Sequence, residues 1–237
     1  MTTERPAASF AGMTPTLNQR GFMSARLDPV SRAFADAAGA LDGEVVDLGC
    51  AYGIATLAAL DAGARVLAVD MEQGHLDVLE QETPSGRRER LRTFVGAMPG
   101  LGLPGASFAA VHTARMLHFL DGDDVMTALA EIRGWLVPGG RLYATVDTPY
   151  TGFWAAAAPE YEARKAAGDP WPGYLDDVGA LLPNGKPDGF VDTMNPMDED
   201  TLVRACTDAG FAVESSATYG PGGEPGRSHA GVVARLP

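Results

Sequence analysis

Residues Val45 to Gly53, with the sequence VVDLGCAYG, constrain the fold more than any other part of this chain. Their β-branched apolar run predicts a buried strand, and the small residues that follow predict a tight turn at which a helix begins. The next segment, IATLAALDAG, is typical of a helix that ends at Gly63, and RVLAVD at 65–70 predicts a second strand. A strand, a helix and a strand in succession form a βαβ unit, so we predict a parallel sheet.

The alternation of strands and helices continues beyond this unit. Further strands are predicted at 91–96, 108–113, 141–147, 211–219 and 229–236, with helices beginning near Gly74, at Asp121 or Asp123, and at Asp198. A short turn-rich connection joins the last two strands, which favours antiparallel pairing between them. We therefore predict an α/β fold with one seven-stranded, Rossmann-like sheet that is mostly parallel, has an antiparallel last strand and carries helices on both faces.

The 237 residues, of which 46% are hydrophobic, are enough for one large α/β domain. We predict an N-terminal arm at 1–27, which is either flexible or folded over a ligand, and a main domain at 28–237. Within that domain, residues 148–195 are rich in proline and aromatic side chains and lack regular periodicity. This segment is predicted to be a lid-like insertion that caps a substrate, or alternatively a small satellite core beneath a long loop.

Charge and cysteine usage exclude several classes of partner. The formal net charge of -13 would repel a phosphate backbone, so we expect no nucleic acid partner. Cys50 and Cys206 belong to no CxxC pair or histidine cluster, so we expect buried reduced thiols and no metal. No apolar run approaches the ~20 residues of a membrane span. These features predict a cytoplasmic protein without a membrane partner, as a monomer or a homodimer.

The spacing of small residues in the first turn separates the nucleotide-binding families. A nicotinamide fingerprint would require a small residue at position 54, where Ile54 stands. The chain instead has D-x-G-x-A-x-G, formed by Asp47, Gly49, Ala51 and Gly53. This pattern resembles motif I of the class I S-adenosylmethionine-dependent methyltransferases. That family usually has glycine in place of Ala51, a departure that narrows the turn without abolishing it.

The resemblance extends along most of residues 40–235. Asp70, at the end of the second predicted strand, stands where the family has an acid that accepts hydrogen bonds from both ribose hydroxyls. Its distance of 23 positions from Asp47 (70 − 47) is near the ~20 expected in such a unit. Two later segments also resemble the family: LVPGGRLY resembles its turn before strand five, and AGFAVES its entry into strand six. The cofactor-binding residues that this resemblance implies are Asp47, Gly49, Ala51, Gly53, Asp70, Met71, Ala97, Met98, Thr113 and Arg115.

The chain departs from the family pattern at two other places. Where the family often has G-D-A after the third strand, this chain has Gly96, Ala97 and Met98, so we expect backbone and apolar contacts to adenine. The family acid in S-F-D is replaced by Ala109. Both losses lie far from the sulfonium end of the cofactor, and we therefore expect altered adenine contacts rather than lost binding.

Ligands of open α/β sheets bind beyond the carboxyl ends of the strands, which identifies candidate catalytic residues at one rim. His118 is predicted to be a general base or, alternatively, a packing residue, and Asp147 a substrate contact or a cap. Tyr150 and His229 are further candidates for a base. Arg115 is predicted to bind a substrate anion or the cofactor carboxylate, or else to pair with Asp121 or Asp124. The substrate-binding candidates are Arg115, Tyr150, Phe153, Trp154, Trp171 and Tyr174.

The resemblance predicts a small-molecule methyltransferase that moves a methyl group from S-adenosylmethionine to an O or N atom of a metabolite, without a metal. In-line displacement at an activated carbon needs mainly alignment, and a base only if the acceptor arrives protonated. One alternative is an S-adenosylmethionine-binding protein that does not methylate, whether a binder or a catalyst of rearrangement. Another is a protein methyltransferase. A nicotinamide oxidoreductase is disfavoured by the glycine spacing.

Overall fold

The computed structural model describes residues 4–8, 13–182, 186 and 190–237. Its main feature is a seven-stranded sheet with the order β5-β4-β3-β6-β7-β9-β8. The first five strands in this order are parallel, and β9 lies antiparallel between β7 and β8, which confirms the predicted mixed sheet. The strands are β3 (Glu44–Leu48), β4 (Arg65–Asp70), β5 (Leu91–Val95), β6 (Phe108–Ala114), β7 (Leu136–Asp147), β8 (Ala212–Tyr219) and β9 (His229–Arg235).

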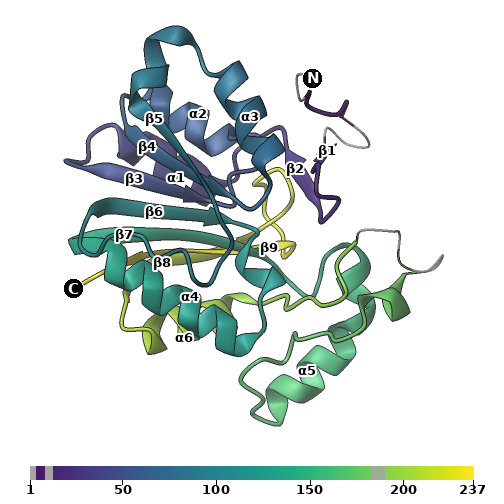
Figure 1. Ribbon diagram of the computed structural model, residues 1–237. Helices are drawn as coiled ribbons and strands as arrows, with labels where there is room; N and C mark the ends of the chain where they lie inside the picture. The colour runs from purple at the N-terminus through teal and green to yellow at the C-terminus, as the bar shows by residue number, and fades with distance from the viewer. Residues whose placement is uncertain (1–3, 9–12, 183–185, 187–189) are drawn as a thin grey trace.

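Helices cover both faces of the sheet (Figure 1). The helices α1 (Pro29–Ala38), α2 (Ile54–Asp61) and α3 (Gln73–Glu82) lie on one face, and α4 (Gly122–Trp135) and α6 (Glu199–Asp208) on the other. Each face has its own apolar core. Phe34 and Ala59 pack against Val45 and Val66 on the first face, whereas Leu129 and its neighbours on α4 and α6 pack on the second. Two 3-10 helices, η2 (Ser85–Arg90) and η3 (Leu117–Phe119), precede β5 and α4.

Local signals explain where these elements begin and end. Asp121 caps α4 by accepting from the Asp124 amide, and Asp198 caps α6 by accepting from that of Thr201. Gly63, with φ of +104°, follows α2 in the left-handed region. β7 begins at Leu136, whereas the predicted strand begins at Arg141. Leu136 and the residues from Arg141 onward both pair with β6, and residues 137–140 form a bulge between them.

The described part of the N-terminal segment forms a hairpin of β1 (Met13–Pro15) and β2 (Phe22–Ser24), which are antiparallel. Met23 on β2 packs in a small apolar cluster with Tyr52 and Val78. The Tyr52 hydroxyl donates to the carbonyl oxygen of Pro15 at 2.7 Å. The hairpin thus contacts the turn that follows β3, at the edge of the sheet where β3 and β4 end (Figure 1).

The segment at 148–195 contains more helix than its composition predicts. It holds η4 (Gly152–Ala157), α5 (Ala158–Ala166) and η5 (Val178–Leu181). Trp154, Val178, Val191 and Met194 form an apolar cluster within the segment. The segment extends from the same edge of the sheet as the hairpin, and α5 lies at its outer end (Figure 1). Within the described parts of the chain, every helix is too short or too polar to span a lipid bilayer.

Candidate active site

The turn between β3 and α2 is built from residues with left-handed backbone. Gly49, Ala51 and Gly53 have φ of +67°, +45° and +77°. A Cβ added at Gly53 would collide with Leu79 Cδ1 at 2.4 Å, and one added at Gly49 would make a tight contact of 3.1 Å with Met116 Cγ. A β-carbon disfavours this region, so Ala51 is strained and needs support from its surroundings.

Asp70 provides that support from the end of β4. Its side chain is almost fully buried, and its Oδ2 accepts from the Ala51 amide at 2.8 Å. Its Oδ1 accepts from the Glu72 amide and contacts His75 Nδ1, both at 2.9 Å. Because a carboxylate has about four lone-pair directions, one direction on Oδ2 is left for a ligand. As placed, the carboxylate can therefore accept from one ribose hydroxyl, whereas the family resemblance implies two.

His75 connects Asp70 to the N-terminal hairpin. The imidazole is buried, and its Nε2 accepts from the Leu17 amide at 2.9 Å. Since a backbone amide can only donate, Nδ1 carries the proton and donates to Asp70. The edge of the His75 ring faces Tyr52, with 5.0 Å between ring centroids. No pattern in the sequence identifies His75, whose role depends on a partner 58 positions away.

An apolar surface adjoins Asp70 at the ends of β4 and β5. Met71, Phe94 and Val95 are 45%, 40% and 46% exposed, which is unusual for large apolar residues in this chain. Ala97 is exposed after β5, whereas Met98 packs against the core. A strained turn, a buried carboxylate with a free lone pair and an apolar surface fit an adenosyl group, which has a planar adenine, a ribose with hydroxyls and no phosphate.

Asp47 lies beneath the turn rather than on its surface. Its side chain is buried, with Oδ1 2.7 Å from His112 Nδ1 and Oδ2 accepting from Thr56 Oγ1 at 2.6 Å. His112 Nε2 lies 2.9 Å from Ser31 Oγ, which donates to Asp28 Oδ2 at 2.6 Å. Both oxygens of Asp47 are thus bonded to protein groups, and the chain of contacts ties β3 to α1, α2 and β6.

Asp28 ends this buried chain of polar contacts at the N-terminus of α1. Burial opposes its ionisation, but hydrogen bonds from the Ser31 hydroxyl and amide hold its pKa below the usual range. Because the Ser31 hydroxyl donates its only proton to Asp28, His112 Nε2 must donate to Ser31. His112 Nδ1 donates to Asp47, so the hydrogen bonds require protons on both ring nitrogens.

Asp147, the last residue of β7, and His229, the first residue of β9, meet at the edge of the sheet. They are opposite partners on β7 and β9, and His229 Nδ1 lies 3.0 Å from Asp147 Oδ1. Trp154 of the 148–195 segment donates from Nε1 to Asp147 Oδ2 at 3.4 Å. Burial disfavours the charged carboxylate, but His118, the hydrogen bond from His229, and Arg115 together hold the pKa of Asp147 well below its usual range.

His118 is a buried neighbour of Asp147. Its Nδ1 accepts from the Asp147 amide at 2.9 Å, and its side chain is buried. Burial lowers the pKa of His118 to about 4, although Asp147 opposes this shift; the cation of Arg115 reinforces it, as does His229 whenever that ring is protonated. The geometry favours the packing and backbone-contact interpretation of His118 over that of a general base.

His118 should make the fold sensitive to acid between pH 6.5 and 4. The unfolded chain binds a proton near the ordinary pKa of 6.5, whereas the folded protein resists protonation until about pH 4. Stability contributed by neutral His118 is therefore present above pH 6.5 and is lost as the pH falls to 4, by up to about 3 kcal/mol. Urea denaturation across this range measures the effect. His118→Asn keeps an acceptor for the Asp147 amide but does not titrate, and should show a shallower pH dependence; equal slopes would contradict the assignment.

Arg115 is a half-buried cation directly after β6, with φ of +55°. Neither Asp121 nor Asp124 forms an ion pair with it, and Asp121 Oδ1 instead accepts from the Asp124 amide at 2.9 Å. Among the described residues, no carboxylate forms an ion pair with Arg115. Thr113, just before it on β6, is fully buried, and its Oγ1 has no hydrogen-bond partner in the described structure. Arg115 is thus available for an anionic group.

The aromatic residues of the 148–195 segment have different surroundings. The Arg227 guanidinium lies 3.7 Å from the centroid of the Tyr150 ring, and the Tyr150 hydroxyl donates to Glu162. Trp171 packs on Gly122 of α4 and under the guanidinium of Arg204, 5.0 Å from the ring centroid. Tyr174 is half-buried and accepts from Arg164 through its carbonyl oxygen. The side chain of Phe153 lies outside the described structure. Of the candidates in this segment, Trp154 is the one bonded to Asp147.

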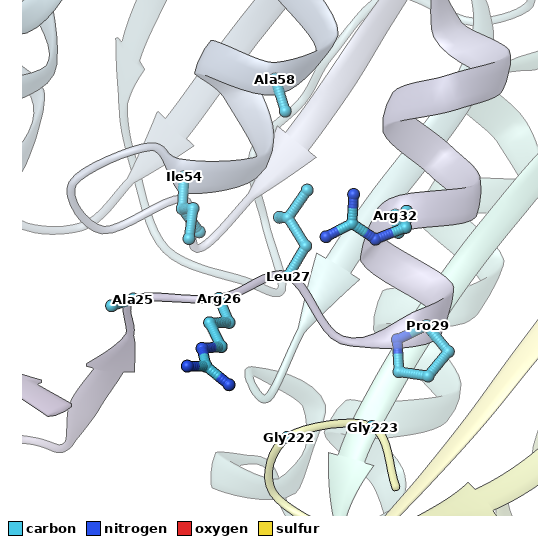
Figure 2. Close-up of a pocket in the computed structure, with 9 residues that line it drawn as sticks. All are labelled: Ala25, Arg26, Leu27, Pro29, Arg32, Ile54, Ala58, Gly222 and Gly223. Atoms are coloured by element: carbon cyan, nitrogen blue, oxygen red, sulfur yellow. The ribbon is translucent and has the colours of Figure 1, made fainter. Parts of the chain in front are cut away.

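A cavity of about 520 Å³ adjoins the start of α2 (Figure 2). It carries two arginines whose side chains pair with no carboxylate among the described residues, and Figure 2 shows Arg32 reaching toward Leu27 across the cavity. An apolar wall with two free cations suits a ligand that combines an anionic group with an apolar body. The lining residues are Ala25, Arg26, Leu27, Pro29, Arg32, Ile54, Ala58, Gly222 and Gly223.

Both cysteines are free thiols buried in the fold, as predicted. Burial raises the pKa of Cys206 to about 12 and that of Cys50 well above its usual value. In the described parts of the chain, no group of three or more His, Cys, Asp or Glu side chains is arranged to hold a metal ion.

Residues 45–140 match a family model described as a methyltransferase domain. A curated relative, the cypemycin N-terminal methyltransferase of a Streptomyces species, is 34% identical over 116 residues. The matched region covers 46% of this chain and 44% of that enzyme, so the chain matches less than half the length of its relative.

Solved structures share the fold over nearly the whole chain. An S-adenosylmethionine-dependent methyltransferase from Mesorhizobium loti has a TM-score of 0.61 at 21% identity, covering 87% of this chain and 96% of that one. The glycopeptide N-methyltransferase MtfA, complexed with S-adenosyl-L-homocysteine, also has a TM-score of 0.61 at 21% identity, covering 91% and 90%. This chain thus carries a methyltransferase-domain match at residues 45–140 and shares the fold of solved S-adenosylmethionine-dependent methyltransferases.

Proposed function

We propose that this protein binds S-adenosylmethionine at the turn after β3 and transfers its methyl group to a nitrogen atom of a peptide or a peptide-like metabolite. The observation that supports the proposal most directly is the turn at 49–53 held by Asp70, which leaves one carboxylate lone pair beside an apolar surface. The bound cofactor would supply a carbon already activated by the sulfonium. The protein's part is to bind, align and exclude water.

The order of strands supports a division of the rim into two parts. Asp70 ends β4, the turn follows β3, Arg115 follows β6, and Asp147 and His229 lie on β7 and β9. Neighbouring strands are about 4.8 Å apart, so roughly 14 Å separate the turn from His229. We assign the ribose and adenine of the cofactor to the ends of β4 and β5, and the middle of the cofactor to the turn. The methyl acceptor is assigned to the part of the rim between Arg115 and His229. Met71, Ala97 and Thr113 keep their proposed cofactor roles.

Nitrogen as the acceptor is supported by the names of two related proteins, an N-terminal methyltransferase and a glycopeptide N-methyltransferase. The net charge of -13 favours a cationic acceptor such as an ammonium group. Arg115 would bind an anionic group of the cofactor or of the acceptor. We also propose residues 148–195 as the substrate cap, with Trp154 contacting Asp147, and the segment at 1–27 as a cover over the cofactor.

Transfer of a radiolabelled methyl group tests this function. The full chain is incubated with S-adenosylmethionine labelled in the methyl group and a mixture of tripeptides, either with free amino termini or with acetylated ones. We expect label only in the free amines, with mass spectrometry placing a 14 Da increment on the terminal nitrogen. Calorimetric binding of S-adenosylmethionine without transfer to free amines would indicate the alternative, a binding protein that does not methylate them.

A further inference from the structure

We propose that His229 is the general base of this reaction, that Asp147 holds it in the required tautomer, and that the acceptor enters as a protonated amine. This inference rests on the proposed methyl transfer and adds to it the residue that makes the nitrogen nucleophilic. The ammonium form of an amine has no lone pair, so it cannot attack the methyl carbon until a proton is removed.

The pairing of His229 with Asp147 determines which ring nitrogen is free. Nδ1 lies 3.0 Å from Asp147 Oδ1, and a carboxylate oxygen accepts, so Nδ1 carries the proton. Nε2 then presents a lone pair. It forms no hydrogen bond with any residue in the described parts of the chain, and the His229 side chain is 11% exposed. A ligand at the rim can thus approach a nitrogen that is ready to accept a proton.

Asp147 is itself fixed by its neighbours. Its Oδ2 accepts from Trp154 Nε1, and its backbone amide donates to His118 Nδ1. An ionised Asp147 stabilises the imidazolium that forms when His229 accepts a proton, which is the role of the third member in a nucleophile-base-acid arrangement. The tryptophan belongs to the proposed cap, so the contact of the cap with the rim and the orientation of the base depend on the same carboxylate.

The other histidine beside Asp147 lacks these properties. His118 Nδ1 is occupied by the Asp147 amide, and burial lowers the pKa of the ring to about 4, so it would hold a proton poorly at neutral pH. Among the described residues, Tyr219 on β8 also faces His229, with 5.7 Å between ring centroids, and Arg115 acts electrostatically on the same carboxylate, Asp147. The Tyr219 hydroxyl donates to Asp28 at 3.1 Å and therefore does not occupy His229.

The proposed step balances in protons and electrons. A proton moves from the ammonium nitrogen to His229 Nε2, which leaves a neutral amine and an imidazolium paired with Asp147. The nitrogen lone pair forms the new N–C bond while the S–C bond breaks, and its electron pair stays on sulfur. The products are a methylated ammonium and neutral S-adenosylhomocysteine, and His229 then releases its proton to water.

The pH profile of His229→Gln separates a base from a structural residue. Using the free tripeptides as acceptors, we expect kcat/KM at pH 7 to fall about 10²-fold, within the usual contribution of a general base. Activity should recover toward that of the wild type above pH ~8, where the free α-amino group loses its proton in solution. Calorimetry should show S-adenosylmethionine affinity within about twofold of the wild type, since the base acts on the other substrate.

Nitrogen-15 NMR of the ring provides a second readout that does not require turnover. His229 should carry its proton on Nδ1 in the wild type, and Asp147→Ala should shift it to Nε2. The base role is overturned if His229→Gln keeps wild-type activity at pH 7, or if its activity is reduced equally at every pH. Absence of transfer by the wild-type protein would instead overturn the proposed function, and the base role with it.

Discussion

Replacing Asp70 with alanine should weaken S-adenosylmethionine binding by between 10²- and 10³-fold, about 3–4 kcal/mol. The substitution removes the acceptor proposed for the ribose and also releases the Ala51 amide, which lies 2.8 Å from Asp70 Oδ2. Ala51 would then have no anchor for its left-handed backbone, and His75 would lose its acceptor. Isothermal titration calorimetry with S-adenosylmethionine measures the loss.

Asp77→Ala is the matched control for this experiment. It also removes one negative charge, at a position on α3 where Asp77, among the residues that the structure describes, accepts only from the exposed Gln73 side chain. Its affinity should remain within about twofold of the wild type, since an exposed pair contributes little. Asp70→Asn keeps the shape of the side chain, and its affinity for S-adenosylmethionine should lie between those of Asp70→Ala and Asp77→Ala. An affinity that is unchanged in Asp70→Ala would contradict the assignment of the ribose to this carboxylate.

Replacing Asp47 with alanine should lower the free energy of unfolding by about 3–5 kcal/mol, because His112 would remain buried without its counter-ion. Both oxygens of Asp47 are hydrogen-bonded, to His112 and to Thr56, and none of these residues is more than 2% exposed. For a chain of this size such a loss corresponds to a fall in Tm of roughly 10 °C. Urea denaturation and thermal unfolding followed by circular dichroism measure both quantities.

The double variant Asp47→Leu with His112→Leu tests the reason for this loss. Removing both partners leaves no unpaired charge, so the double variant should be destabilised less than the Asp47→Ala protein. If Asp47→Ala costs less than about 1 kcal/mol, the buried pair is not a stabilising element. The result also separates a structural role of Asp47 from a role in cofactor binding. If Asp47 only bound the cofactor, replacing it would leave the stability of the free protein unchanged.

Elements with local signals could be predicted from the sequence. Asp121 and Asp198 cap helices where the pattern predicts them, and the strand before the glycine turn ends as expected. Two helices with equally local signals were missed. Asp28 caps α1 with Pro29 at its first position, and α5 has Pro159 near its start and basic residues in its last turn. The proline-rich composition around α5 obscured that pattern.

Site residues whose partners are distant in sequence could not be predicted. Asp70 was found because its place at the end of a strand follows from the βαβ unit, yet its bonds to Ala51 and His75 depend on the packed turn. His229 was recognised as a candidate base, but its pairing with Asp147 depends on the insertion of β9 beside β7. Strand order in a sheet is a tertiary property, and no local pattern in this chain specifies it.

The insertion of β9 also determines when the enzyme can become competent during its synthesis. The turn, Asp70 and His75 come from 27 consecutive residues (75 − 49 + 1), so the proposed cofactor site can form while the ribosome is still producing the chain. Asp147 and His229 are 82 positions apart and meet only when the last strand enters between two others. Such a long loop is slow to close. We therefore expect an incomplete chain to acquire the cofactor site before the proposed base, so that a nascent protein can bind S-adenosylmethionine without transferring its methyl group.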